Sequence, residues 1–404
     1  MKYNFDSINN RVGTNSVKWD IHPDVIPLWV ADMDFQVLPE LKEALSKRVD
    51  EGIFGYTLVP ESYYEAIINW FDRRHYWHID RSWILYTSGV IPAMAAALKA
   101  FTLPGEKVLI QTPVYNCFFS SIANCGCEPV ENELVREGNT YRIDFADFEN
   151  KCADPKTTVF LLCNPHNPAG RVWTKEELER MNEICMRHDV KVISDEIHCE
   201  LIMPGYTFVP FASVSEACAY NSVILNSPTK NFNIAGLQIA NIICKNRQWL
   251  RRIDRAVNIN ETCDVNPFGV IALQEAYNKG AEWIDELNTY LYDNYKALKD
   301  FFHEELPKLE VLKLEGTYLV WVDITALEFT SDEVADKLLK EAKVWVNSGT
   351  MYGRKAGQGY LRINIATPRA TLMEGLKRMG RLLSQYLVEE GEFDRVGVGF
   401  PGEV

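Results

Sequence analysis

Short apolar runs alternate with longer amphipathic segments through the middle of the chain. The runs with the length and β-branched character of buried strands are 83–87, 107–111, 158–163, 190–194, 222–226 and 238–244. After the run at 83–87 a helix is predicted to extend through Ala100, and after the run at 107–111 a second helix is predicted over 115–124. Thr174 and Glu177 form a capping-box pattern, which predicts a helix from there to Arg187. Strands interleaved with helices predict a mainly parallel sheet covered on both faces.

The pattern changes after a long helical tract at 283–305. Strands at Val311, 317–323, 344–347 and 360–365, with two helices, predict a smaller α+β domain. The first fifty residues offer an extended arm and a helix at 39–49, which we expect to pack with the small domain. The expected division is 1–50 for this arm, 51–285 for the large domain, 286–390 for the small domain and 391–404 for a tail.

Composition and charge narrow the class of protein. The chain has 404 residues and a formal net charge of −14, with no long basic run, which argues against nucleic acid and acidic membranes as partners. No apolar stretch reaches the roughly 20 residues that a membrane span needs. The first residues lack the apolar core of a signal peptide, so we expect a cytoplasmic location. The ten cysteines are then expected to be reduced, and their spacing completes no metal site.

A lysine and an acid follow two of the predicted strands. Lys230 comes just after the strand at 222–226 and is flanked by Ser227 and Thr229, whose hydroxyls can hold a phosphate. The carboxyl ends of parallel strands are where open α/β sheets bind ligands, so a lysine there suits a Schiff base to pyridoxal phosphate (PLP). Asp195 ends the strand at 190–194 and can supply the acid that the pyridine nitrogen of PLP requires.

Two turns at other strand ends are candidates for binding the same cofactor. Asn167 lies in the rigid turn Asn-Pro-His-Asn-Pro-Ala-Gly after the strand at 158–163, and its amide can donate to the phenolate oxygen. Ser88, Gly89 and Val90 open a helix, whose N-terminal N–H groups can bind phosphate. An ordinary turn is the alternative reading of each motif.

Three aromatic or imidazole side chains are weaker candidates. Tyr115 follows a strand end and can stack on a pyridine ring, although a lone tyrosine is more often a core residue. His198, three residues after Asp195, can reach the phenolate side of the cofactor or orient Asp195, with a structural role as the alternative. Tyr56 is hard to place from local pattern, and its alternative is a surface aromatic.

Arg362 is the candidate for holding a substrate. In the strand at 360–365, Arg362 and Asn364 share one face and the aliphatic residues share the other. An arginine in such a strand requires an anion, and its planar fork fits a carboxylate, which an amino-acid substrate supplies. An internal salt bridge is the alternative.

Three motifs, in this order along the chain, resemble those of the fold-type-I PLP enzymes of the class I/II aminotransferase superfamily. They are Asn-Pro-His-Asn-Pro-Ala-Gly at 164–170, Ser-Asp-Glu-Ile-His at 194–198 and Ser-Pro-Thr-Lys-Asn-Phe-Asn-Ile-Ala-Gly-Leu at 227–237. Within that superfamily, the segments 27–35, 202–205 and 316–323 resemble MalY/PatB-type cystathionine β-lyases, or C–S lyases. The resemblance covers nearly the whole chain.

The resemblance implies a role for each candidate residue. Lys230 is then the Schiff-base lysine, Asp195 the partner of the pyridinium nitrogen and Asn167 the phenolate ligand. Arg362 would hold the substrate carboxylate, and Tyr56 would act in catalysis from the neighbouring subunit of a homodimer. The remaining cofactor contacts would be the stacking ring of Tyr115, His198 and a phosphate cradle of Ser88, Gly89, Val90, Ser227 and Thr229.

The same resemblance implies β-elimination from cystathionine or cysteine thioethers, giving thiol, pyruvate and ammonia. Spacing and composition do not choose between elimination and transamination, so an aminotransferase is the alternative. A PLP-bearing protein that regulates a partner by docking to it is a more remote one. Two positions depart from the pattern: Gln238 stands where many transaminases carry a phosphate-binding arginine, and Asn116 where some lyases carry a second tyrosine.

Overall fold

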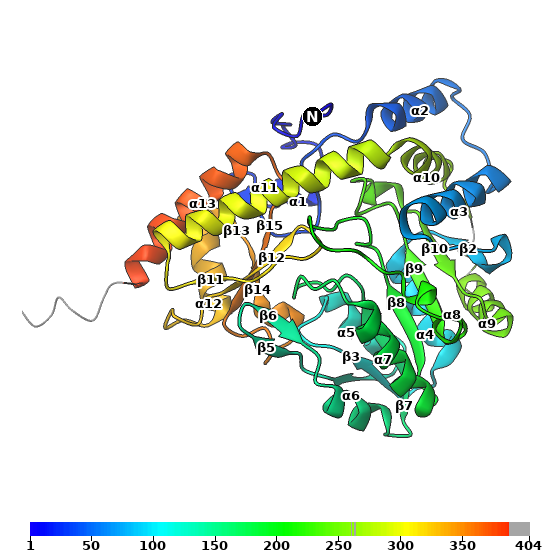
Figure 1. The fold of residues 1–404 in the computed structure, drawn as a ribbon. Coiled ribbons are helices and arrows are strands. Elements are labelled where there is room, and N and C mark those ends of the chain that lie inside the picture. The colour runs from blue at the N-terminus through cyan, green and yellow to red at the C-terminus, as the bar shows by residue number, and fades with distance from the viewer. Residues whose placement is uncertain (260, 262–263, 388–404) are drawn as a thin grey trace, which may run out of the picture.

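A seven-stranded sheet lies at the centre of the larger part of the molecule in the computed structural model, which describes residues 1–259, 261 and 264–387 (Figure 1). Five of its strands run parallel in neighbouring pairs, and β10 is antiparallel to both of its neighbours, so β2 points the same way as the rest. In spatial order the strands are β2 (Ile84–Thr87), β10 (Ala240–Ile243), β9 (Ser222–Asn226), β8 (Lys191–Asp195), β7 (Thr157–Cys163), β3 (Lys107–Ile110) and β4 (Glu128–Glu131). The mainly parallel sheet predicted from the sequence is confirmed.

Side chains of each strand alternate between two hydrophobic cores, one on either face of the sheet. In β7, Val159 and Leu161 pack with α4 (Val90–Phe101), whereas Phe160 and Leu162 belong to the core on the opposite face. Each such buried aliphatic side chain stabilises the fold by about 1.5–3 kcal/mol. Helices that pack with α4 are α5 (Asn116–Asn124) and α9 (Arg247–Asn258); helices contributing to the opposite core include α3 (Glu61–His75), α6 (Phe145–Cys152), α7 (Lys175–Arg187), α8 (Glu216–Tyr220) and α10 (Pro267–Lys279).

The helix termini follow local sequence signals. Thr174 Oγ1 accepts from the N–H of Glu177, and the Glu177 carboxylate accepts from the N–H of Thr174, so the capping box predicted for α7 is present. The hairpin of β5 (Val135–Glu137) and β6 (Thr140–Arg142), and the edge strand β4, were not predicted. Most of the β4 residues are exposed, so no apolar alternation marks that strand in the sequence.

A smaller antiparallel sheet forms the second part of the molecule, as expected. The long helix α11 (Ala281–Glu305) runs from the side of the large sheet to this smaller part (Figure 1). The strands lie in the order β11 (Glu310–Val311), β12 (Leu319–Asp323), β15 (Tyr360–Asn364) and β14 (Asn347–Ser348), with the helices α12 (Ser331–Lys337) and α13 (Arg369–Leu383) beside them.

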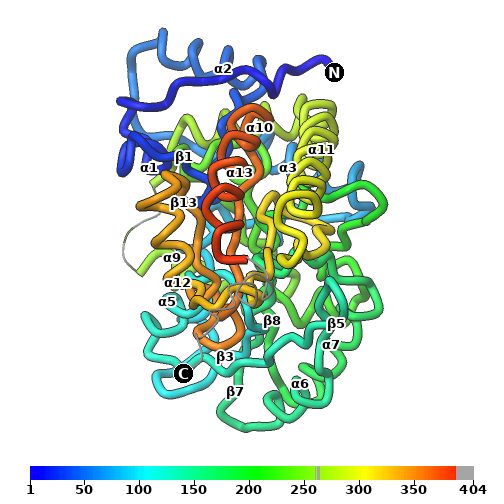
Figure 2. Tube along the Cα trace, turned by 90° about the vertical axis from the view of Figure 1, so that its left-hand side faces the viewer, coloured from blue at the N-terminus to red at the C-terminus, as the bar shows by residue number. Residues whose placement is uncertain are grey.

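The N-terminal residues contact both parts of the molecule. After α1 (Val17–Asp20), β1 (Ile26–Pro27) pairs in parallel with β13 (Val344–Trp345) of the small domain (Figure 2). By contrast, α2 (Pro39–Asp50) packs against α10, within the range expected for the large domain, which corrects the expectation that this helix packs with the small one. The domain boundaries themselves stay a prediction, and the expected tail at 391–404 lies outside the described residues.

Candidate active site

The carboxyl ends of β2, β3, β7, β8 and β9 meet at one edge of the large sheet, because these strands share one direction. A cavity of about 180 Å³ lies at this edge. Its lining brings together residues that are far apart in the sequence: Ala31, Val90, Ile91, Tyr115, Cys163, Asn167, Asp195, Ile197, His198 and Lys230.

Lys230 projects from the turn after β9 into this cavity. Its Nζ atom donates a hydrogen bond to the backbone carbonyl of Ala31 at 2.6 Å. Exclusion of water lowers the pKa of Lys230, and the positive charge of Arg362 acts in the same direction. In the same turn, the hydroxyl groups of Ser227 and Thr229 are hydrogen-bonded to each other, with their oxygens 2.8 Å apart. The chain therefore holds an amine that gives up its proton more readily than an exposed lysine does.

Asp195 is the last residue of β8 and lies opposite Cys163 of β7 in the ladder. Both face the α4 side of the sheet, since Ile193 and Leu161, two residues earlier, belong to that core. Burial raises the pKa of Asp195 to about 7, although Lys230 opposes this shift. One hydrogen bond, from the N–H of Ile197 to Oδ1 at 3.1 Å, favours its ionised form. A nearby cation on a bound molecule would ionise this carboxyl.

Arg362 of β15 reaches the large domain and contacts Asn167. Its Nη1 atom donates to Asn167 Oδ1 at 3.1 Å and its Nη2 atom to the carbonyl of Trp29 at 2.9 Å, and the guanidinium lies over the Tyr352 ring. The side chain is 3% exposed, and its Nε atom has no hydrogen-bond partner. Within the described part of the chain, no carboxylate pairs with Arg362, which argues against the internal salt bridge.

His198 and Tyr115 complete the polar lining. The His198 ring packs edge-on against Tyr318, and its Nδ1 atom is buried without a hydrogen-bond partner. Burial, with the positive charges of Lys230 and Arg362, lowers the pKa of His198 to about 3, so the imidazole is neutral. Burial raises the pKa of Tyr115, which therefore keeps its phenolic proton.

The N-terminus of α4 borders the same cavity. Gly89 is its N-cap, and the first N–H that bonds within the helix is that of Ala93, to the Gly89 carbonyl. The N–H groups of Val90 and Ile91 precede it and carry the positive end of the helix dipole. Ser88, half-buried, is the residue before the cap. This terminus has the properties of an anion site.

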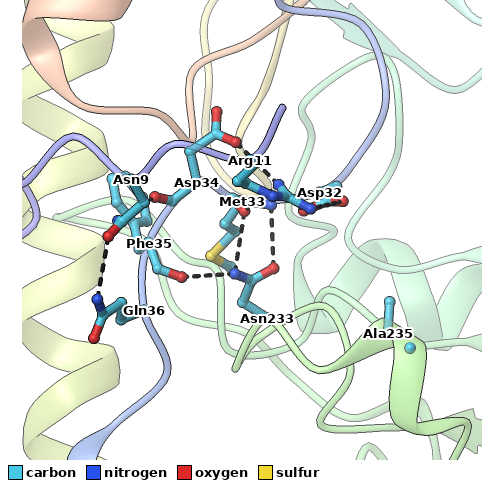
Figure 3. A pocket seen from close by; sticks show the side chains of 10 residues that line it. Asn9, Arg11, Asp32, Met33, Asp34, Phe35, Gln36, Asn233 and Ala235 are labelled. Atoms are coloured by element: carbon cyan, nitrogen blue, oxygen red, sulfur yellow. Dashed lines mark hydrogen bonds and ion pairs between the residues drawn. The ribbon is translucent and has the colours of Figure 1, made fainter. Parts of the chain in front are cut away.

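Ala31, in the segment 29–35, is a part of the cavity wall that sequence reasoning missed. The carbonyls of Trp29 and Ala31 accept from Arg362 and Lys230, and backbone atoms leave no side-chain signal in a sequence. Asn233 fixes the same segment: its Nδ2 donates to the carbonyls of Met33 and Phe35 at 3.1 and 2.8 Å (Figure 3). The segment thus joins the lysine-bearing turn to the strand that carries Arg362.

Of the residues singled out from the sequence, the cavity lining includes Val90, Tyr115, Asn167, Asp195, His198 and Lys230, and it does not include Ser88, Gly89, Asn116, Ser227, Thr229, Arg362, Tyr56 or Gln238. Tyr56 is 100% exposed in the single chain, in an extended stretch without regular structure. Gln238 is exposed and has a left-handed backbone, with φ of 51°. Cys163 and Ile197 line the cavity and were not predicted to do so, although their places beside Asp195 at the strand ends are the signal that identifies them.

Residues 23–379 match the family model for class I and II aminotransferases. The chain belongs to this family. The chain is similar to the cystathionine β-lyase PatB of Bacillus subtilis, with 41% identity over 387 residues, covering 94% of this chain and all of the relative.

Solved structures of family members superimpose closely on this chain. Cystalysin of Treponema denticola, which contains PLP, is 36% identical with a TM-score of 0.92, covering 95% of this chain and 100% of the other. A PLP-bound C–S lyase of Staphylococcus hominis is 33% identical with a TM-score of 0.89, covering 96% and 100%. The expected fold class and family resemblance are confirmed.

Within the described residues, no cluster of three or more acidic, histidine or cysteine side chains could hold a metal ion. A search of the same residues finds no helix with the length and apolar character to cross a membrane.

Proposed function

We propose that this protein is a PLP-dependent carbon–sulfur β-lyase that cleaves cystathionine or related cysteine thioethers to a thiol, pyruvate and ammonia. The observation that carries the proposal is one cavity that holds Lys230 with a lowered pKa and a buried Asp195, next to a guanidinium, Arg362, without a carboxylate partner. Arg362 would pair with the carboxylate of an amino-acid substrate and Asp195 with a pyridinium ring, and Lys230 supplies the amine that reacts with the cofactor.

The residues present fit PLP. His198 Nδ1 and Arg362 Nε are buried without partners, and Asp195 is a buried carboxyl whose ionisation requires a cation. Lys230, Asp195, Asn167, Tyr115 and His198 would hold the cofactor ring. Its phosphate would bind at Ser88, Gly89 and Val90, whose N–H groups begin α4, together with Ser227 and Thr229.

PLP, when bound, supplies an electron-withdrawing ring that acidifies the Cα–H bond of an amino acid. Asp195, as a carboxylate, holds the proton on the pyridine nitrogen. Lys230, with its lowered pKa, takes the Cα proton as a neutral amine at its Nζ atom. Arg362 binds the substrate carboxylate through its open Nε and its Nη groups, which fixes the direction of the Cα–H bond. The neutral His198 borders the ring site without adding a charge.

We favour release of a thiolate from Cβ over transamination because several curated relatives carry lyase names, although a solved structure that is 40% identical carries the name of an aminotransferase. PatB of Bacillus subtilis is called a cystathionine β-lyase, whereas an aromatic-amino-acid aminotransferase of Thermococcus litoralis is 26% identical. The aminotransferase remains the second candidate, since the same groups can return a proton to the cofactor instead.

Incubation with cystathionine and no 2-oxo acid tests the proposal. A lyase releases pyruvate, ammonia and thiol over many turnovers, because elimination leaves the cofactor in its starting form. An aminotransferase stops after one equivalent per site, and a 2-oxo acid restarts it. Cystathionine with a saturated, non-cleavable carbon in place of sulfur is the matched control and gives no pyruvate.

The proposal includes a homodimer with shared sites and a cytoplasmic location. Ile53, Phe54, Tyr56 and Leu58 are 57–100% exposed in one short segment, an apolar surface that a second subunit would cover. Tyr56 would then reach the partner's cavity.

Nine described cysteines are free thiols, which supports a reducing compartment. Cell fractionation tests the location.

A further inference from the structure

Glu196, next to Asp195, is a buried acid with an unusual division of hydrogen bonds. Three donors converge on Oε1: Ser194 Oγ at 2.9 Å, the N–H of Phe211 at 2.8 Å and Asn164 Nδ2 at 3.4 Å. The other oxygen, Oε2, is buried and accepts from no group in the described part of the chain. The side chain is 0% exposed, and no cation pairs with it among the described residues. A buried carboxylate with one bare oxygen and no cation would be costly.

Asn164, the side chain already bonded to Glu196 Oε1, also has a buried oxygen without a partner. Both hydrogens of Asn164 Nδ2 have acceptors, one at Glu196 Oε1 and one at the carbonyl of Val209 at 3.2 Å. Asn164 Oδ1 is therefore the open atom of that amide, and it too is buried without a donor. Two acceptor oxygens cannot satisfy each other unless one of them carries a proton.

We propose that Glu196 carries a proton on Oε2 and donates it to Asn164 Oδ1, so that acid and amide form a closed pair with two hydrogen bonds. This pair makes Glu196 a positioning residue. It joins the turn after β7, which carries Asn167, to the end of β8, which carries Asp195. The backbone supports the same junction, since the N–H of Asn164 donates to the carbonyl of Asp195 at 2.9 Å.

Burial, which raises the pKa of Glu196 to about 8, agrees with this assignment. Glu200, four residues later, shows the opposite arrangement: Trp70 and His75 contact Oε1 at 2.7 and 2.6 Å, and Arg74 contacts Oε2 at 2.8 Å. His75 and Arg74 lower the pKa of Glu200 to about 2. The loop thus holds one neutral and one ionised buried glutamate.

The consequence for catalysis rests on the proposed function. Two adjacent ionised carboxyls would repel each other and compete for the proton of the pyridinium ring. A neutral Glu196 leaves Asp195 as the one negative charge of the pair, directed at that ring.

Infrared difference spectra of the holoenzyme test the protonation directly. Replacing Glu196→Gln should remove a carbonyl stretch of a protonated carboxyl at pH 7, whereas Glu200→Gln should remove a carboxylate band. Glu196→Gln should also keep kcat/KM within about threefold, because its amide can donate to Asn164 as the acid does. Glu196→Ala should lose about 10- to 100-fold, the range for residues that orient a catalytic group.

Loss of a carboxylate band in Glu196→Gln would overturn the proposal, as would a Glu196→Gln enzyme as impaired as Glu196→Ala. Should Glu196→Ala fail to fold, the infrared comparison of the two glutamine variants decides alone. The spectra need no substrate, so a protein that shows the acid band and releases no pyruvate from cystathionine refutes the lyase proposal and leaves this one standing.

Discussion

Lys230, Asp195 and Arg362 owe their chemistry to the removal of water around them. Burial penalises the charged form of each acid or amine, so the pKa of Lys230 falls and that of Asp195 rises. Arg362 cannot give up its proton and instead takes neutral oxygen partners, the Asn167 amide and the Trp29 carbonyl. A ligand of opposite charge would therefore change the protonation of Lys230 and Asp195 and replace the neutral hydrogen-bond partners of Arg362.

Replacing Lys230→Ala should abolish the visible absorbance of the lysine-bound cofactor and reduce turnover by about 10²–10⁴-fold, the usual contribution of a general base. Absorbance spectra and pyruvate release measure the two effects. Lys340→Ala removes a surface lysine that pairs with Asp336 and serves as the control. A Lys230→Ala protein that still forms a borohydride-reducible PLP adduct would contradict the assignment.

Asp195 should make the stability of the cofactor-free protein depend on pH. Its pKa is about 7 when folded and about 4 when unfolded, so the folded state binds more protons between these values and stability falls as pH rises. Asp195→Asn removes this loss, which is on the order of 4 kcal/mol at most. Urea unfolding should therefore find the PLP-free variant more stable than the PLP-free parent at pH 8, with the difference shrinking as the pH falls and vanishing below about pH 4. Equal midpoints at pH 8 would show that Asp195 ionises freely.

Arg362→Ala should raise KM by about 10- to 150-fold, the loss of 1.5–3 kcal/mol expected for hydrogen bonds to a charged group. The absorbance of the resting holoenzyme should change little. Arg378→Ala, which removes an exposed arginine paired with Glu374 on α13, is the control. An altered spectrum with an unchanged KM would place Arg362 on the cofactor instead.

Sequence reasoning found these side chains because each stands at a strand end or breaks an apolar pattern. It could not find the carbonyls of Trp29 and Ala31, because every residue has one and only tertiary structure selects between them. Nor could it see the pairing of Glu196 with Asn164, which depends on atoms left without partners in the packed interior.

At the scale of elements, the sheet was more predictable than its edges. The buried strands β7 and β9 contain continuous apolar runs of three or more residues, which are typical of a parallel sheet covered on both faces. The reversed direction of β10 has no local signal, since direction depends on the path of the chain between strands. For α2, the apolar face predicts that the helix is buried on one side, but it does not identify the helix against which that side packs.

The hydrogen bonds between Asn233 and residues 33–35 should hold in place the segment that carries Ala31 of the cavity wall. Asn233→Gly removes its amide bonds and keeps a residue that tolerates the φ of 57°, so the cost should be about 1–3 kcal/mol. Hydrogen exchange should accelerate at 33–35. Asn15→Gly, at an exposed position with φ of 61°, is the control. Unchanged exchange would show that the other hydrogen bonds of the segment, such as that from the Asp34 N–H to the Ala366 carbonyl at 3.0 Å, fix it without Asn233.

At the scale of the whole molecule, a homodimer with shared sites predicts complementation. Lys230→Ala and Tyr56→Ala should each be nearly inactive, yet refolding them together should restore about a quarter of the parental activity, because half of the dimers contain one intact site of two. Sedimentation measures the assembly and pyruvate release the activity. Mixtures no more active than the separate variants would place Tyr56 in its own subunit or outside catalysis.

On the proposed role of Arg362, its hydrogen bond to the Trp29 carbonyl makes substrate binding an exchange of partners rather than the filling of a vacant place. A carboxylate that approaches the guanidinium has to displace the neutral carbonyl oxygen of Trp29. The indole of Trp29 is stacked on that of Trp345, with ring centroids 4.0 Å apart. A full negative charge wins that competition, because hydrogen bonds to ions are roughly twice as strong as neutral ones. An ester or amide of the same amino acid would only replace the Trp29 carbonyl with another neutral oxygen, so it would gain little binding free energy at Arg362. On the same proposal, the Trp29 carbonyl competes with the substrate for Arg362 and should disfavour uncharged analogues before any bond is broken.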